Sequence, residues 1–297
     1  FMAKARQVFT SMISVSKATA PKFPPLGITD RKVKQALLAA VDKIRENTVR
    51  AEVVRALEAN DVQAAIDAIR FDLGEAYLKS FLPSPLRDAY ELSGETAATK
   101  LGNALKLDVS FDLTNPRASQ YASQRSAELI KEFGDSSKDA IRRLVGRAFD
   151  EGITPQRLAR LISDSGIGIT DRQALALERL RSRLEDDPSN DYTQGDIDKI
   201  IGRQYDRYLD YRSNLIARSE ILEAEANGQR ELWHQAAEDG LIGINSKRRW
   251  IGNQISACDV CAGLDGEEAT LFGFYPGGYS GPTAHPGCAC SEEIIPE

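Results

Sequence analysis

The stretch YRSNLIARSEILEAEANGQRELWHQAAEDG, residues 211–240, is rich in alanine, glutamate, leucine and arginine, which favour helices. It continues a helical pattern that begins near Asp196 and ends at Gly240, a residue typical of the position after a helix. Apolar and small side chains at spacings of three, four and seven predict one buried face, made of Leu215, Ser219, Leu222, Ala226 and Trp233. The sequence therefore predicts a long helix against which other elements pack.

The chain before this helix also has helical periodicity, and it shows several breaks. Asn60-Asp61 and the PSP segment at 83–85 interrupt the first half, and 107–116 reads as an extended connector. After Pro116 we expect one helix up to Gly134, a second up to Gly152, then helices at about 154–162 and 170–185 and a polar loop at 186–195. Thr154 and Pro155 are a typical helix start.

Residues 1–28 carry Lys4, Arg6, Lys17 and Lys22 and no acidic side chain. We expect a basic, flexible arm that ends in the proline-restricted segment PKFPPLG. The alternative is a secretory signal, with VFTSMISV as its apolar core and ATA as its cleavage site, but that core is short and holds three hydroxyl residues. No apolar run approaches the roughly 18 residues of a membrane span, so none is expected.

The composition changes after Gly240. Short strands are predicted at 247–252, 267–272 and 290–296, separated by loops rich in glycine, proline and aromatic residues. A module of this size has little apolar area to bury and needs a staple. The predicted fold is mainly α, a multi-helix body with a small zinc-stapled β module, divided into an arm (1–28), an N-terminal helical region (29–115), a helical domain (116–240) and the module (241–297).

All four cysteines of the chain and one of its two histidines lie in this module. CDVC at 258–261 and AHPGCAC at 284–290 have the spacing of ligand pairs in a tetrahedral zinc site. A site closed by four protein ligands is structural, because no position is left for water. Five candidates compete for the four positions: Cys258, Cys261, His285, Cys288 and Cys290.

We expect Cys258, Cys261 and His285 to bind, together with one of the last two cysteines. If CAC is extended, alternation sends Cys288 and Cys290 to opposite faces. Two disulfides, a redox pair and four free thiols are the alternatives. The redox reading is weakened because CAGLDGEE reads as a turn before a strand, whereas a redox Cys-x-x-Cys opens a helix.

Other polar residues have simpler interpretations. The net charge of −6 argues against a surface that binds nucleic acid throughout, and the arginines at 142, 143, 147, 179, 181 and 183 are a local basic surface or ordinary exposed side chains. Glu223 and Glu225 resemble the acidic pair of ADP-ribosyl transfer enzymes, but they lie inside a helix. His234 is expected at the surface, where the helix C-terminus favours its charged form.

The segments IARSEILEAEANGQRELWHQA, KRRWIG, CDVCAGLDGE and HPGCAC, in this order, resemble the phage minor head proteins of the Mu F-like and SPP1 gp7-like type. The resemblance covers about residues 135–297 and includes AFDEGITPQRLARLI. Arg218, Ser219 and Glu220 match the family's Arg-Thr/Ser-Glu triplet, with serine in place of the commoner threonine. Ala289 stands where the family often has arginine.

This resemblance implies a non-enzymatic virion component near the portal vertex inside a tailed-phage or prophage-derived head, and in the host cytoplasm during assembly. It would contact the portal protein, the major capsid protein or both, and act in head morphogenesis and in DNA packaging or ejection. The basic arm suits packaged DNA or an acidic surface of the portal protein. The competing hypotheses are an ADP-ribosyltransferase-like enzyme and a free zinc-dependent DNA-binding module.

Overall fold

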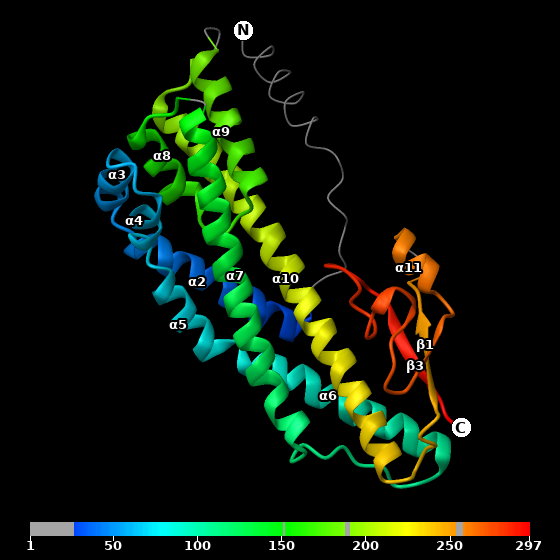
Figure 1. The fold of residues 1–297 in the computed structure, drawn as a ribbon. Coiled ribbons are helices and arrows are strands. Elements are labelled where there is room, and N and C mark those ends of the chain that lie inside the picture. Colours follow the sequence, from blue (N-terminus) through cyan, green and yellow to red (C-terminus); the bar gives the residue numbers. More distant parts are fainter. Residues whose placement is uncertain (1–26, 151, 188–190, 254–257) are drawn as a thin grey trace.

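The computed structural model describes residues 27–150, 152–187, 191–253 and 258–297. The predicted arm at 1–28 therefore lies outside the described residues, apart from Gly27 and Ile28. Helices form most of the molecule (Figure 1): α2 (Ile28–Asn47), α3 (Arg50–Glu58), α4 (Val62–Asp67), α5 (Phe71–Phe81), α6 (Pro83–Leu105), α7 (Pro116–Asp150), α8 (Pro155–Leu161), a π-helical turn (Ile162–Gly166), α9 (Asp171–Asp186) and α10 (Gln194–Glu238). The mainly helical prediction is confirmed.

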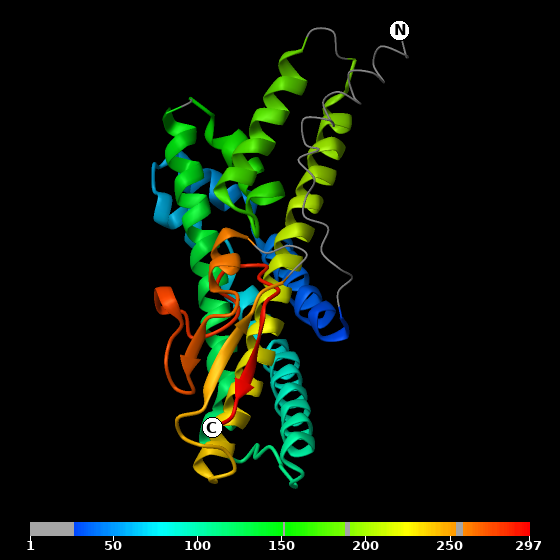
Figure 2. The ribbon, with the colours of Figure 1, turned by 90° about the vertical axis from the view of Figure 1, so that its right-hand side faces the viewer.

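The predicted long helix is α10, which has 45 residues. It begins at a capping box in which the side chain of Thr193 accepts a hydrogen bond from the amide of Asp196. Helices α2, α6 and α9 and strand β3 (Ser291–Ile295) all contact it. Helix α10 is thus the support for both the helical body and the C-terminal module (Figures 1 and 2).

The buried face of α10 differs from the predicted one. Of the predicted stripe, Trp233 is buried, whereas Leu215, Ser219, Leu222 and Ala226 are half-buried. The fully buried line includes the small residues Ser213, Ala217, Ala224 and Gly228. Small side chains let helices approach closely, and a Cβ added at Gly228 would lie 2.1 Å from the carbonyl oxygen of Tyr90 on α6. The close contact between the backbones of α10 and α6 at Gly228 favours burial of this face of α10, and hydrophobic periodicity does not detect such a contact.

One predicted break is wrong. Gly134 does not end a helix, because it lies inside the 35-residue helix α7. The side chains buried on either side of it are Ile130, Phe133, Ile141 and Leu144. The burial of these side chains offsets the roughly 1 kcal/mol that one interior glycine costs. The predicted break at the PSP segment is confirmed, because α5 ends at Phe81 and α6 begins at Pro83. The prolines lie in the first turn of α6, where proline is tolerated. The starts at Thr154 and Thr170 and the left-handed Gly152 follow the sequence prediction.

One hydrophobic core joins the first half of the chain to the second. It includes Leu37, Val41 and Leu86 as well as Leu144 and Ile221. The predicted division at 115/116 stays a prediction, and the two ranges share this core.

The C-terminal module is a three-stranded antiparallel sheet in the order β2-β1-β3, packed beside the second half of α10 (Figure 2). Strands β1 (Lys247–Ile251), β2 (Glu268–Thr270) and β3 lie at the three predicted positions. A short helix, α11 (Asp259–Leu264), and a 3-10 turn (Pro276–Gly278) lie in the connections. The module's own cluster of buried residues is small: Trp250, Cys261, Leu264, Ala269, Tyr275, Cys288 and Cys290.

Candidate metal centre

The module brings all five predicted ligands together. Cys258 is the N-cap of α11, and its Sγ accepts a hydrogen bond from the amide of Cys261 at 3.5 Å. His285 and Cys288 come from the loop before β3, where Gly287 is left-handed and the amide of Cys288 donates to the carbonyl oxygen of His285 at 3.0 Å. A helix start and a tight turn therefore place the two ligand pairs opposite each other.

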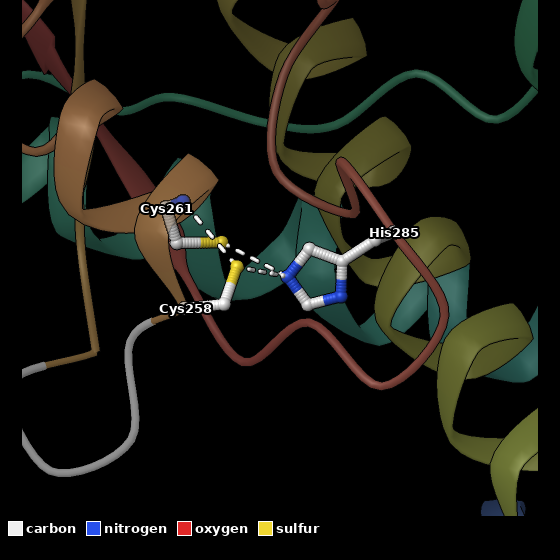
Figure 3. A group of neighbouring side chains, drawn as sticks. All are labelled: Cys258, Cys261 and His285. Atoms are coloured by element: carbon white, nitrogen blue, oxygen red, sulfur yellow. Dashed lines mark hydrogen bonds between the residues drawn. The ribbon is translucent and has the colours of Figure 1, made fainter.

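The ligand atoms form two overlapping triads. One is Cys258, Cys261 and His285, and the other is Cys261, Cys288 and Cys290; in each, the atoms lie within 4.8 Å of one another. His285 Nε2 lies 3.1 Å from the Sγ atoms of both Cys258 and Cys261, and all three side chains point to one place (Figure 3). The Sγ atoms of Cys261 and Cys288 are 3.7 Å apart. This cluster can hold a metal ion.

Two details of the prediction are wrong. Cys288 and Cys290 do not diverge, since both are buried and both reach Cys261, because the chain becomes a regular strand only at Ser291. The Cys-x-x-Cys segment opens a helix instead of a turn, although the neighbouring sheet is antiparallel. The four thiols are free, so the structure holds no disulfide among them.

The thiols differ in their electrostatic environment. Cys258 is exposed, and the hydrogen bond from the Cys261 amide lowers its pKa. Burial raises the pKa of Cys261 and of Cys290. A metal ion would counter this effect, because thiolate is the binding form and the cation stabilises it. A bound cation would therefore stabilise thiolates in a cluster whose other three cysteines, Cys261, Cys288 and Cys290, are buried.

The loop that carries His285 is bonded directly to α10. The amide of Gly287 donates to Ser219 Oγ at 3.0 Å, and the hydroxyl of Thr283 donates to Glu223. Ser219 is the middle residue of the Arg-Ser-Glu triplet, so two motifs that are 68 residues apart meet here. Glu223 is thereby occupied in holding the loop.

The other triplet residues lie around this contact. Glu220 is buried on the α7 side of α10, and Arg125 donates to both of its carboxylate oxygens, at 2.7 and 2.8 Å. Burial raises the pKa of Glu220, and Arg125 opposes the rise. Arg218, which directly precedes Ser219 on α10, is half-buried. The triplet thus contacts the module with Ser219 and the helical body with Glu220.

A buried charge network, which sequence reasoning missed, fixes β3 to α10. Glu292 lies between Arg248 of β1, at 2.9 Å, and Arg230 of α10, at 3.4 Å. Arg248 also donates to the carbonyl oxygens of Ser280 and Gly273, at 2.8 and 2.7 Å. The strand alternation of SEEII shows that Glu292 and Glu293 face opposite sides, but it does not say which one is buried.

His234 is not the surface histidine that was predicted. Its Nε2 lies 3.4 Å from the carbonyl oxygen of Leu271, and its ring stacks on Phe272 with centroids 4.5 Å apart. Burial lowers its pKa, so the neutral form is favoured. The module covers this part of α10, and the resulting burial lowers the pKa of His234 by more than the dipole at the helix C-terminus raises it.

No protein-family model, curated protein or solved structure matches the chain. Among the described residues, no helix has both the length and the apolar composition that crossing a membrane requires. The case for a function therefore rests on the residues and their contacts.

Proposed function

We propose that the cluster holds one structural Zn²⁺ ion. Two sulfurs bound tetrahedrally at about 2.3 Å lie about 3.8 Å apart, and a sulfur and an imidazole nitrogen lie about 3.5 Å apart. The Cys261–Cys288 separation of 3.7 Å fits the first value. The separations of 3.1 Å from His285 Nε2 are shorter, and a small opening of the loop would meet the second. Protein donors suffice to fill all four positions, which suits a structural role.

We further propose that the chain is a minor head protein of a tailed phage or prophage-derived particle, located near the portal vertex. The hydrogen bond between Ser219 and the amide of Gly287 carries this proposal, because it joins the helix motif of the family to its His-Pro-x-Cys-x-Cys motif. Because the two motifs contact each other, they belong to one structural unit of this chain, as the resemblance requires.

In this role the metal and the buried charge network hold the module on α10 as a fixed attachment piece. The helical body or the module would contact the portal protein, the major capsid protein or both. The basic residues before Gly27 would contact packaged DNA, and this contact would weaken as the salt concentration rises.

Particles released by cells that encode the chain provide the test. Mass spectrometry of purified particles is expected to find the chain at far fewer copies than the major capsid protein, together with the portal protein. A deletion strain, complemented with the wild-type chain or with Cys261→Ser, is expected to recover infectious or DNA-filled particles with the wild type alone. Absence of the chain from purified particles would refute the proposal.

Incubation with labelled NAD separates this role from the enzyme hypothesis. Both carboxylate oxygens of Glu223 accept hydrogen bonds, one from Thr283 and one from Asn227, and this supports a structural role for Glu223. We expect no transfer of label. Transfer that is lost in Glu223→Gln or Glu225→Gln would favour the enzyme. Salt-sensitive DNA binding by the full chain that is lost on chelation would favour the zinc-dependent DNA-binding module.

A further inference from the structure

The Cys-x-x-Cys pair of the metal centre differs from the rest of the cluster in its exposure to solvent. Cys258 is exposed, whereas Cys261, Cys288 and Cys290 are buried. A small oxidant in solution therefore reaches the sulfur of Cys258 first, because the oxidation of cysteines follows their exposure. Cys258 is also the N-cap of α11, so the pair opens a helix, as redox-active Cys-x-x-Cys pairs do.

Cys261 is the thiol that is placed to react with an oxidised Cys258. The two Sγ atoms lie within 4.8 Å of each other, and Figure 3 shows both sulfurs pointing towards the ring of His285. Side chains three residues apart at the start of a helix are neighbours, and a disulfide can span this separation once the side chains rotate. Cys288 lies 3.7 Å from Cys261, but it shares no donor triad with Cys258. Within the described part of the chain, Cys261 is thus the favoured partner of Cys258.

We propose that the metal centre is also an oxidation site, in which a peroxide converts Cys258 and Cys261 to a disulfide and the loss of both sulfur donors releases the metal. This proposal rests on the zinc site proposed above. The disulfide would form in two steps, and hydrogen peroxide is the oxidant.

In the first step, the thiolate of Cys258 attacks one oxygen of hydrogen peroxide, the O–O bond breaks and hydroxide leaves, so that Cys258 becomes a sulfenic acid. In the second step, the thiolate of Cys261 attacks the sulfur of Cys258, the S–S bond forms, the S–O bond breaks and a second hydroxide leaves. The two thiolates lose two electrons and the peroxide gains them. Two protons from the solvent convert the hydroxides to water.

The disulfide would leave only His285, Cys288 and Cys290 as donors. Three protein donors do not close a tetrahedral site, so the structural metal would lose its hold on the loop that carries His285. The buried contacts of Glu292 with β1 and α10 do not involve the cysteines, and they would still hold β3. Hydrogen exchange measured by mass spectrometry is therefore expected to become faster in the loop 283–288 and to stay slow in β3.

The test uses the full chain, purified with reduced thiols and loaded with zinc, and the zinc content is measured before any oxidant is added. Hydrogen peroxide is then added, the released zinc is followed with a colorimetric chelator, and the free thiols are alkylated and counted. We expect zinc release to accompany a fall from four free thiols to two, since all four cysteines start free and one disulfide consumes two of them. A thiol reductant together with added zinc is expected to restore the starting state.

Peptide mapping identifies the cysteines that form the disulfide. Glu267 lies between Cys261 and Cys288, so cleavage after glutamate places the two cysteine pairs on separate peptides. We expect the alkyl label on Cys288 and Cys290, and an unlabelled disulfide in the peptide that contains Cys258 and Cys261.

Two variants are compared with the wild type after chelation has removed the zinc, so that differences in metal affinity do not affect the comparison. Cys258→Ser is expected to lose free thiols to peroxide at least about tenfold more slowly than the wild type, because its remaining thiols are buried. Cys290→Ser keeps the reactive pair and is expected to react at the wild-type rate.

Three results would overturn the proposal: zinc that is retained with all four thiols free, a disulfide that joins Cys261 to Cys288, and equal rates of thiol loss in Cys258→Ser and the wild type. A chain that holds no zinc before the oxidant is added would instead refute the zinc site itself, so the two failures are distinguishable.

Discussion

Replacement of Glu292 by glutamine tests whether the buried charge network holds the module on α10. Glu292 and Arg248 have side chains that are 1% and 2% exposed, and Arg230 is 9% exposed. Removing one partner of a buried ion pair costs about 3–5 kcal/mol, because the opposite charge is left uncompensated. Arg248 keeps the carbonyl oxygens of Ser280 and Gly273 as acceptors. We therefore expect a loss near the lower end, about 3 kcal/mol of the free energy of unfolding.

The neighbouring residue offers a matched control. Glu293 pairs with Arg249 at 3.2 Å, but the two side chains are 52% and 40% exposed. Glu293→Gln is therefore expected to cost about 0–1 kcal/mol. Denaturant unfolding followed by tryptophan fluorescence suits the measurement, because the chain's two tryptophans, Trp233 and Trp250, are both buried near this interface. If the two variants lose the same free energy, the network does not hold the module.

Three further predictions concern the metal, the helix contact and the histidine. Cys261→Ser is expected to weaken zinc binding more than Cys258→Ser, in a chelator-competition titration, because Cys261 belongs to both donor triads; equal losses would contradict this. Gly228→Ala is expected to lower the thermal midpoint of unfolding, because the added Cβ would lie 2.1 Å from the α6 backbone. Gly202→Ala on the same helix meets no atom within 4 Å, and its gain of up to about 1 kcal/mol in helix propensity is expected to raise the midpoint. His234 is expected to titrate below its ordinary pKa of about 6.5 in an NMR titration assigned with His234→Gln. The stability that it contributes is therefore present above about pH 6.5 and is lost as the pH falls through its pKa in the folded state. Titration at or above the ordinary value would show that the module does not cover it.

Local signals in the sequence were sufficient for most of the elements and for the residues of the candidate site. Helix propensity and the caps at Thr154 and Thr170 place the helices, and alternation places the three strands. Cysteine spacing identifies the ligand cluster. These features depend on residues that are near each other in the chain, and for that reason the sequence alone determined them.

Contacts between distant segments decided the rest. The buried face of α10 includes small residues such as Gly228, because α6 approaches the helix there. The continuity of α7 through Gly134 and the lowered pKa of His234 also depend on packing against other segments, which the local sequence pattern does not show. Which of two adjacent glutamates is buried was settled by Arg248 and Arg230 from other elements. Local sequence determines what each segment can form, whereas desolvation, close packing and charge pairing depend on which segments meet, and the tertiary structure alone decides that.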